Sequence, residues 1–370
     1  MKTGEAKVQI GLREGEAPLV LITHDESTFN ANDGKRRLWV EKGKTPIRPK
    51  TKGKGIMVSG FLTPGGPLRV PDTISDTELL SNPSWPLKDG KPVRDAFEYL
   101  EYGKDNYWTG DKMVTHTISI ALPIFKYAFP RCQGLWAFDN ATNHSSFHPN
   151  ALVASKMALG PGGAQPKMRE TFDHGRGLPQ AMVYPDNHWD PNLRGKAKGL
   201  KAVLKERGLW PANDRRVDGM RFLLKCPTTG GRPGCELRVD TELEGICCAQ
   251  SMMAAQRDFQ EQKGWLQQEL DAANQEVIFY PKFHCELNFI EYFWCAAKWY
   301  TREHCEYTIE GLRKVVPKAL ASITTASINR YYHRSMRTLE AYADGLVYGT
   351  REFKQHVYKE HRQVTDKSKW

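Results

Sequence analysis

The amino-acid sequence predicts an α/β fold with a mixed central sheet of about five strands and helices on both faces. Short apolar runs, rich in β-branched residues, alternate along the chain with longer segments of helical periodicity. Two of the apolar runs end at polar residues that include an aspartate. A long stretch rich in Gly, Pro and charge, about 150–248, has weak periodicity and indicates an insertion before the last acid-bearing helix.

The first third of the chain is expected to form a three-stranded meander. Residues 18–23 (PLVLIT) predict a buried strand that ends at the polar residues around Asp25. The segments 36–43 and 55–63 predict the second and third strands of the meander. Residues 64–95, rich in Pro, Gly, Ser and Asp, are expected to be irregular.

The rest of the core is expected to follow in the order helix, strand, insertion, helix, strand, helices. A helix over 111–129 should be kinked by Pro123, and GLWAF at 134–138 predicts a strand that ends at Asp139. The remaining predictions are a helix at 250–274, a strand at 276–281, a helix at 287–300 and two helices within 308–346. We therefore expect a catalytic domain over 18–305 and a helical extension with a basic tail over 306–370.

Composition favours a nucleic-acid partner without proving one. The 370 residues carry a formal net charge of +10, which attracts polyanions, although many other basic proteins share this bias. Eight cysteines between Cys132 and Cys305 do not resemble the disulfide framework of a small secreted domain, so a reducing compartment is the simpler interpretation. The sequence shows no secretory pattern and no apolar run long enough for a membrane span, and we expect a nuclear location if the protein acts on chromosomal DNA.

Three carboxylates are the main candidates for chemistry. If the first and fourth strands are neighbours, Asp25 and Asp139 lie side by side at their ends, and the following helix can bring Glu291 to them. Three converging carboxylates repel one another unless a hard cation such as Mg²⁺ or Mn²⁺ is bound. Two such ions can activate an attacking oxygen and neutralise a leaving oxygen at a phosphodiester, without a protein nucleophile.

Each acid also has a structural interpretation. Asp25 and Asp139 are ordinary turn residues, and Glu291 can complete a capping pair with Asn288 as N-cap. Glu26 and Glu286 are nearby carboxylates that compete for the assigned roles. His24 and His144 either assist at the site, by contacting water or phosphate, or serve as structural hydrogen-bonding residues.

Three sequence blocks together resemble the mariner-like superfamily of DDE transposases, and are closest to fungal DDE superfamily endonucleases. The blocks are THDESTF at 23–29 followed by GIMVSGF at 55–61, LWAFDNATNHS at 135–145, and YPKFHCELNFIEYFW at 280–294. The resemblance implies an RNase H-like core, with Asp25, Asp139 and Glu291 as catalytic metal ligands. It also implies that Asn140, His144 and Asn288 are neighbours of the site.

The resemblance further implies cut-and-paste transposition, with transposon ends and target DNA as partners and a homodimer as a plausible assembly. The chain departs from the family in having Phe289 where many relatives have Pro, and in the long interval between Asp139 and Glu291. The first predicted strand begins near residue 18, so we expect a core without the N-terminal end-recognition domain. The alternative is a catalytically inactive, transposase-derived DNA-binding or scaffold protein.

Two further clusters are candidate binding sites. A basic run is expected to contact the phosphate backbone, or else to be a solvated hairpin: Lys35, Arg36, Arg37, Lys42, Lys44, Arg48, Lys50, Lys52 and Lys54. Four cysteines within the insertion are either free thiols or ligands of a structural Zn²⁺: Cys226, Cys235, Cys247 and Cys248.

Overall fold

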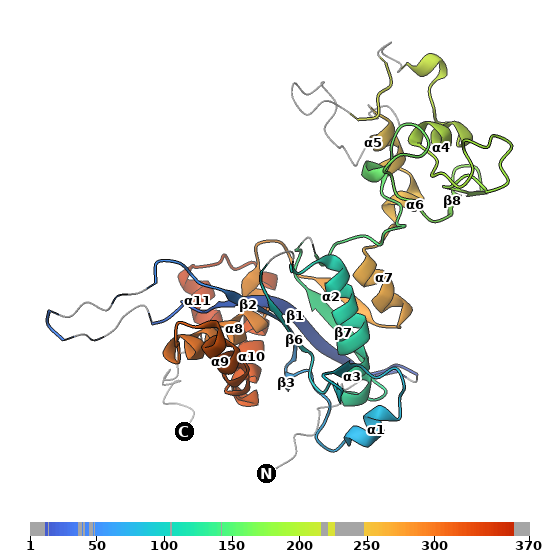
Figure 1. Cartoon of the computed structure of the whole chain (residues 1–370). Coiled ribbons are helices and arrows are strands. Elements are labelled where there is room, and N and C mark those ends of the chain that lie inside the picture. Colours follow the sequence, from blue (N-terminus) through green and yellow to red (C-terminus); the bar gives the residue numbers. More distant parts are fainter. Residues whose placement is uncertain are drawn as a thin grey trace. The chain divides into compact units, whose positions relative to one another are not determined.

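The computed structural model describes two compact units (Figure 1). Unit 1 comprises Met1–Ser145 and Leu266–Trp370, and unit 2 comprises Ser146–Trp265. The residues whose structure is described are 12–13, 15–35, 39, 41–43, 47, 49–103, 106–141, 143–215, 221–225 and 248–358. The predicted insertion, 150–248, falls inside unit 2, whereas the helices after residue 306 belong to unit 1.

A six-stranded mixed sheet forms the centre of unit 1, and its order is β10-β7-β1-β2-β3 with β6 also paired to β2. The strands β1, β7 and β10 are parallel, and β2 is antiparallel to β1, β3 and β6. The bounds are β1 Leu19–Asn30, β2 Gly55–Thr63, β3 Gly66–Pro67, β6 Phe97–Glu101, β7 Gln133–Phe138 and β10 Glu276–Phe279. The predicted α/β class with a mixed central sheet is confirmed.

The antiparallel half of the sheet differs from the predicted meander. β1 pairs directly with β2, and the third antiparallel strand is β6, beyond the segment expected to be irregular. The predicted strand at 36–43 is wrong for its described residues, 39 and 41–43, which are not extended in a sheet. The side chain of Trp39 is fully exposed, so this segment has no buried apolar face to hold it against a sheet.

Helices cover both faces of the sheet, as predicted. One face carries α2 (Gly110–His116), η1 (Thr117–Ala121) and α3 (Leu122–Ala128), which together match the helix predicted over 111–129. The wide turns of η1 immediately precede Pro123, whose ring nitrogen cannot donate to the preceding turn. The other face carries α8 (Ile290–Glu303), α9 (Ile309–Ala321) and α10 (Thr325–Ala343), and α11 (Arg351–Val357) packs on α10.

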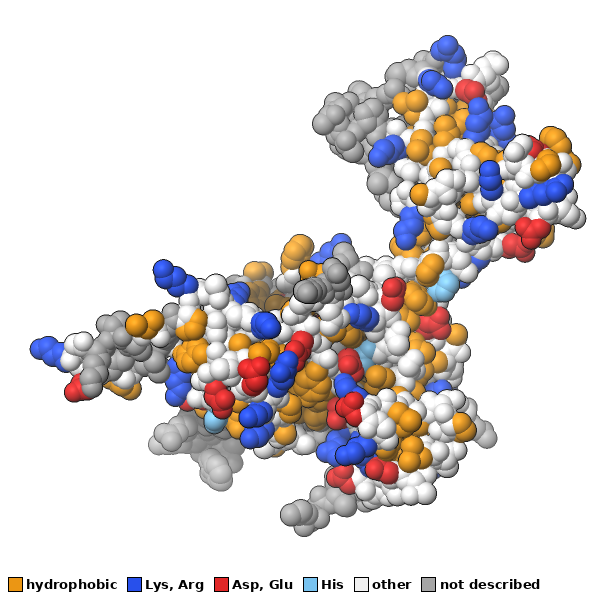
Figure 2. All heavy atoms as spheres, viewed as in Figure 1, with side chains coloured by type: hydrophobic (Ala, Val, Ile, Leu, Met, Phe, Trp, Pro, Cys, Tyr) orange, Lys and Arg blue, Asp and Glu red, His pale blue; other side chains and the backbone are white. Residues whose placement is uncertain are grey.

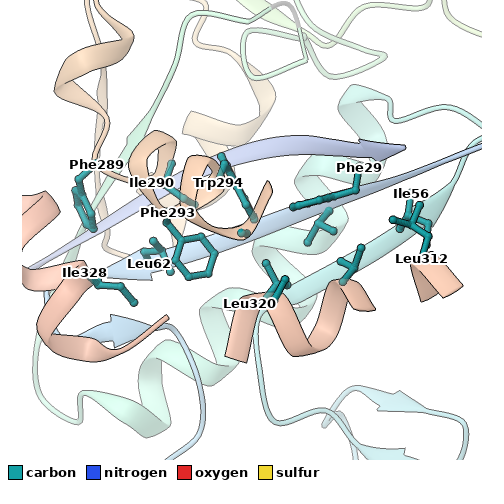
Figure 3. Close-up of a cluster of buried hydrophobic side chains, with 14 of the residues drawn as sticks. Phe29, Ile56, Leu62, Phe289, Ile290, Phe293, Trp294, Leu312, Leu320 and Ile328 are labelled. Atoms are coloured by element: carbon teal, nitrogen blue, oxygen red, sulfur yellow. The ribbon is translucent and has the colours of Figure 1, made fainter. Parts of the chain in front are cut away.

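The main hydrophobic core lies between the sheet and helices α8, α9 and α10 (Figure 3). The start of helix α8 contributes Phe289, Ile290, Phe293 and Trp294, each at most 1% exposed. Their partners in this core include Phe29, Ile56 and Leu62 from the sheet and Leu312, Leu320 and Ile328 from the other helices. Because α8 is held along its apolar face, its N-terminal turn is fixed against β1.

The remaining short elements of unit 1 lie outside the main sheet. They are α1 Asp76–Leu80, β4 Leu87–Lys88, β5 Lys91–Pro92, α7 Trp265–Ala272 and η5 Cys285–Leu287. The helix predicted over 250–274 is wrong as one element, because it is divided into α5 (Ala249–Ala254), α6 (Arg257–Gln260) and α7. Gln256 adopts an extended backbone conformation between the first two of these helices, and residues 262–264 are not helical.

Unit 2 has its own small core, built from Leu152, Met157, Met182, Leu200, Val203 and Met253, among others. Its elements are η2 Ala154–Lys156, β8 Thr171–Asp173, β9 Leu178–Gln180, α4 Leu200–Glu206, η3 Ala212–Asp214, α5 Ala249–Ala254 and α6 Arg257–Gln260. Arg207 and Asp258 form a buried bidentate ion pair at 2.7 and 3.0 Å. Among the helices of the described ranges, none is both long and apolar enough to cross a membrane.

Candidate active site

The parallel pairing of β1 with β7 brings Asp25 and Asp139 to corresponding positions. The last pair in this ladder joins Thr23 to Ala137, and each aspartate lies two residues beyond its member of that pair. The sequence predicted that β1 ends at Asp25, but β1 continues to Asn30 because it stays paired with β2 after it leaves β7. Asp25 is therefore held by a strand backbone, whereas Asp139 lies just after a strand end.

Glu291 reaches the same place from the first turn of α8. Asn288, two residues before this helix, is buried and ties it to β1. The Asn288 Nδ2 donates to the backbone oxygen of His24 at 3.1 Å, and the Thr23 hydroxyl donates to Asn288 Oδ1 at 2.5 Å. The predicted capping pair is wrong: Phe289 occupies the N-cap position and no side chain caps the helix, because the Asn288 amide is engaged by the strand.

The three carboxylates line one cavity of about 440 Å³. Other lining residues come from the loop after β7 and from the chain that leads to α8, and the complete set is Asp25, Asp139, Asn140, Ala141, Tyr280, Pro281, Lys282, Phe283, His284, Cys285, Asn288 and Glu291. The structure thus brings together five of the predicted residues, the three acids with Asn140 and Asn288. His24 and His144 do not line this cavity.

Asp25 has an environment that resists its negative charge. Burial is the main cause of its strongly raised pKa, and the neighbouring carboxylates of Glu291, Glu26 and Asp139 raise it further. The indole Nε1 of Trp294 donates to Asp25 Oδ2 at 3.1 Å and supplies a neutral dipole rather than a compensating cation. Burial also raises the pKa of Glu291, with Lys298 opposing and Asp139 reinforcing this effect.

Asp139 is held ionised by its contacts. Burial opposes its charge, but the imidazole of His144 and the backbone N–H of Ala141 lower its pKa below the ordinary value. The His144 Nδ1 contacts Asp139 Oδ1 directly. The adjacent Asn140 Nδ2 donates to the backbone oxygen of Tyr280 at 2.5 Å, which fixes the loop after β7 against the chain that leads to α8.

The two competing carboxylates have other partners. Glu26 points to the opposite face of the sheet, where it accepts a hydrogen bond from Trp108 Nε1 at 2.5 Å. Glu286 accepts from the Tyr342 hydroxyl at 2.5 Å and contacts His284 Nδ1 at 2.8 Å. Neither lines the cavity. The geometry therefore favours Asp25 and Glu291 over these neighbours as the acids of this cavity.

Several residues at the site are not singled out by sequence reasoning. Trp294 has the pattern of a core residue, and nothing in that pattern predicts its hydrogen bond to Asp25. A signal is nevertheless present, because position 294 lies three residues after Glu291 and shares its helix face. Lys282, Phe283 and Cys285 form part of the rim, and the Phe283 side chain is 99% exposed.

The basic run is only partly described. Lys42, Lys50, Lys52 and Lys54 are exposed, whereas Lys35 forms an ion pair with Glu303 at 2.5 Å. Arg36, Arg37, Lys44 and Arg48 lie outside the described residues. Figure 2 shows basic and acidic side chains intermixed on the visible face of unit 1, and many basic side chains with few acidic ones on the visible face of unit 2.

The predicted cysteine cluster lies almost wholly outside the described residues. Cys226, Cys235 and Cys247 are among the residues without a description. Cys248 is buried, and its Sγ contacts Ser251 Oγ at 3.1 Å.

Comparison with solved structures gives distant matches to complexes of the Mos1 transposase. The Mos1 transposase paired-end complex with left transposon end matches with a TM-score of 0.41 and 10% identity, over 88% of this chain and 55% of that chain. The Mos1 mariner paired end complex with Mn and the Mos1 Strand Transfer Complex each match with a TM-score of 0.41 and 11% identity, over 89% of this chain and 56% of theirs.

The chain thus spans about 55% of the length of the first of these solved chains. No family model and no curated protein matches the sequence. Sequence identity of 10 to 11% carries no information about activity or partners. Any functional conclusion has to come from the site itself.

Proposed function

We propose that unit 1 is a metal-dependent DNA endonuclease and strand transferase, the catalytic core of a cut-and-paste transposon enzyme. The observation that carries this proposal is the meeting of Asp25, Asp139 and Glu291 in one open cavity, although long stretches of sequence separate them. In this proposal Mg²⁺ or Mn²⁺ is the cofactor, and DNA of transposon ends and target sites is the substrate.

The donor set fits hard divalent cations. It consists of the carboxylate oxygens of Asp25, Asp139 and Glu291, which are the kind of ligand that Mg²⁺ and Mn²⁺ prefer. Burial first, and then the neighbouring carboxylates of Glu291 and Glu26, raise the pKa of Asp25, so its protein surroundings do not compensate its negative charge. A bound divalent cation would remove this imbalance.

Each residue has a definite part in the proposed reaction. Asp25 and Asp139 hold the cations at the end of the parallel strands, and Glu291 completes the ligand set from α8. Bound as a pair, such ions activate the attacking oxygen and stabilise the leaving oxygen of a phosphodiester. His144 and Asn288 act as positioning residues, since one contacts Asp139 and the other anchors the turn that carries Glu291.

The wider proposal concerns DNA and location. The exposed Lys42, Lys50, Lys52 and Lys54 are suited to contact phosphates by charge, and the net charge of +10 favours a polyanionic partner. Transfer of DNA ends within a chromosome would place the protein in the nucleus, and a homodimer would allow two ends to be handled together.

A nicking assay on supercoiled plasmid with Mn²⁺ tests the activity. We expect metal-dependent nicking by the wild-type chain and a loss of about 100-fold or more in Asp139→Asn, because the carboxylate is a proposed ligand. Glu291→Gln should show the same loss. The matched control is Glu286→Gln, a carboxylate near the cavity that Tyr342 and His284 already engage, and this variant should still nick DNA.

Two results would reject the enzymatic proposal. One is nicking that survives Asp139→Asn, which would identify a contaminating nuclease. The other is salt-sensitive DNA binding by a folded wild-type chain without nicking, which would instead favour a transposase-derived DNA-binding or scaffold protein.

A further inference from the structure

A second group of potential ligands lies behind the acidic cavity, on the opposite face of β1. Side chains alternate along a strand, so Asp25 faces α8 whereas His24 and Glu26 face the α2 side. The loop after β7 adds His144 to this group. One ligand atom from each of His24, Glu26 and His144 lies within 4.8 Å of the other two.

Both histidines have one nitrogen engaged and one nitrogen without a partner. His24 Nε2 lies 2.7 Å from the Ser59 hydroxyl, and His144 Nδ1 contacts Asp139. The other nitrogens, His24 Nδ1 and His144 Nε2, are buried and have no hydrogen-bond partner. Buried polar atoms without partners are costly, so a pair of them beside one carboxylate indicates that something else satisfies both.

The supporting hydrogen bonds are those expected around metal-binding histidines. A ligating histidine donates its other N–H to a carboxylate or another acceptor, which fixes the tautomer and the ring orientation. Asp139 is this acceptor for His144, and the Ser59 oxygen is the acceptor for His24. The Ser59 hydroxyl can then donate to His116 Nδ1, 3.0 Å away, and burial keeps His116 neutral by lowering its pKa to about 3.

The distance between His144 and Glu26, which form a long ion pair, also matches that between two ligands of one metal ion. His144 Nε2 and Glu26 Oε1 are 3.5 Å apart, beyond the usual hydrogen-bond range. Two ligands of one tetrahedral Zn²⁺, each about 2.0 to 2.2 Å from the ion, lie about 3.4 Å from each other. The distance between His144 Nε2 and Glu26 Oε1 is therefore close to the distance between two ligand atoms of one tetrahedral ion.

We propose that His24 Nδ1, His144 Nε2 and a Glu26 oxygen bind one tetrahedral transition-metal ion of the Zn²⁺ class, separate from the acidic cavity. The His24 and His144 rings are almost fully buried, whereas the Glu26 side chain is 18% exposed, which leaves access for a water as fourth ligand. The ion links β1 to the loop after β7 and so fixes Asp139 through His144.

This site does not depend on the proposed nuclease activity, because none of its three ligands lines the acidic cavity.

Co²⁺ titration of the metal-stripped full chain tests the site, because tetrahedral Co²⁺ absorbs visible light much more strongly than octahedral Co²⁺ in an oxygen site. We expect one equivalent of Co²⁺ to give the strong tetrahedral spectrum in the wild type, and Zn²⁺ to displace it. The same spectrum should appear in the Asp25→Asn, Glu291→Gln double variant, in which the acidic cavity is disabled.

Ligand variants and one matched control complete the experiment. Glu26→Gln keeps the size of the side chain and should weaken Co²⁺ binding by more than the roughly 10- to 100-fold that loss of a supporting partner costs. His24→Gln should abolish the spectrum. The matched control is Glu286→Gln, since the Glu286 side chain is also 18% exposed, and it should bind Co²⁺ like the wild type. Circular dichroism confirms that each variant is folded.

The inference is overturned if the folded wild-type chain gives no tetrahedral spectrum, or if the spectrum survives in His24→Gln. Failure of the nuclease proposal is distinguishable from this result. A tetrahedral spectrum in a chain that never nicks DNA would support the histidine site and reject the enzyme. Nicking without the tetrahedral spectrum would support the enzyme and reject the histidine site.

Discussion

At the scale of single residues, Asp25 is the residue of the candidate site whose surroundings most disfavour a negative charge. Its side chain is 8% exposed, faces two other carboxylates, and receives a hydrogen bond from Trp294 but no cation. Buried charges without compensation are costly, and proteins keep such arrangements mainly at functional sites. Asp139 differs, because its contact with His144 lowers its pKa and favours the ionised carboxylate although burial opposes the charge.

Substitution Asp25→Asn should stabilise the metal-free chain at neutral pH. The raised pKa means that the folded state holds a proton which the unfolded state has released, so stability falls as pH rises from the ordinary Asp pKa through the raised value. The Asn side chain does not titrate, so stability is not lost as pH rises, and its amide oxygen can still accept the hydrogen bond from Trp294 Nε1. We expect a gain of roughly 0.5 to 2 kcal/mol in urea unfolding with EDTA at pH 7.5.

The same comparison at about pH 3, below the ordinary Asp pKa of about 3.9, should show no gain. Glu286→Gln is the contrasting control. Burial opposes the charge of Glu286, but Tyr342 and His284 lower its pKa, so its removal should not stabilise the chain at neutral pH. A stability loss on Asp25→Asn at pH 7.5 would contradict this view of the site.

At the scale of elements, the site depends on how β1 and α8 are joined. Asn288 is 3% exposed and bonds to both Thr23 and the backbone of His24, so it sets the position of the turn that carries Glu291. The sequence alone indicates a helix N-cap here, because an Asn before an apolar helix is most often that. The local sequence pattern does not predict the hydrogen bonds between Asn288 and β1.

Asn288→Ala should therefore lower both stability and activity. Loss of two buried hydrogen bonds leaves polar partners unsatisfied, and we expect a cost of about 1 to 3 kcal/mol in chemical unfolding. Nicking activity should fall although every proposed metal ligand remains. The same substitution at exposed Asn329, whose amide reaches the Pro64 oxygen only at 3.5 Å, is the control and should be nearly neutral. Equal effects at the two positions would contradict the assigned role.

Strand β2 imposes a second constraint next to the site. Gly60 pairs with Asp25, and a Cβ at this position would come within 2.5 Å of the Phe97 ring. Gly60→Ala should destabilise the chain by about 1 to 3 kcal/mol, the usual cost of overpacking. Gly103→Ala is the matched control because nothing lies within 4 Å of its added Cβ. Thermal unfolding of both variants measures the difference, and equal melting temperatures would refute the constraint.

The elements that local pattern predicts well are those with an apolar run and a sharp end. The strand at 134–138 and the strand that begins at Glu276 are both of this kind, and both carry or lead to site residues. Strand β6 has no such signal, because its residues, FEYLE, are mostly half-buried and its extension is defined by pairing with β2. The full length of β1 is not predicted either, because its second half contains polar residues and is extended through its pairing with β2.

At the scale of the whole molecule, charge and division into two units are the main features. Unit 2 has its own hydrophobic core and a basic visible face. Under the proposed function, this face would be a second surface suited to contact phosphates by charge. The sequence predicts an insertion at this point but not its compact core, because the apolar residues of that core are widely spaced in a Gly- and Pro-rich stretch.

DNA binding should weaken steeply with salt, and part of this effect should come from the basic run. Replacing exposed Lys50, Lys52 and Lys54 with Ala should lower DNA affinity and reduce the salt slope by about 0.9 for each phosphate that is no longer neutralised. Fluorescence anisotropy at several salt concentrations measures this slope. Ala substitutions at Lys314, Lys318 and Lys354, also exposed, are the control. An equal change in both triple variants would show that only total charge matters.

An anomalous difference map from crystals of the full chain soaked with Mn²⁺ tests directly whether the three carboxylates bind metal ions. We expect strong peaks in the cavity between Asp25, Asp139 and Glu291, and their loss in Asp139→Asn crystals. A map with no Mn²⁺ at these three carboxylates, from crystals in which the cavity is open to solvent, would rule out the proposed metal site.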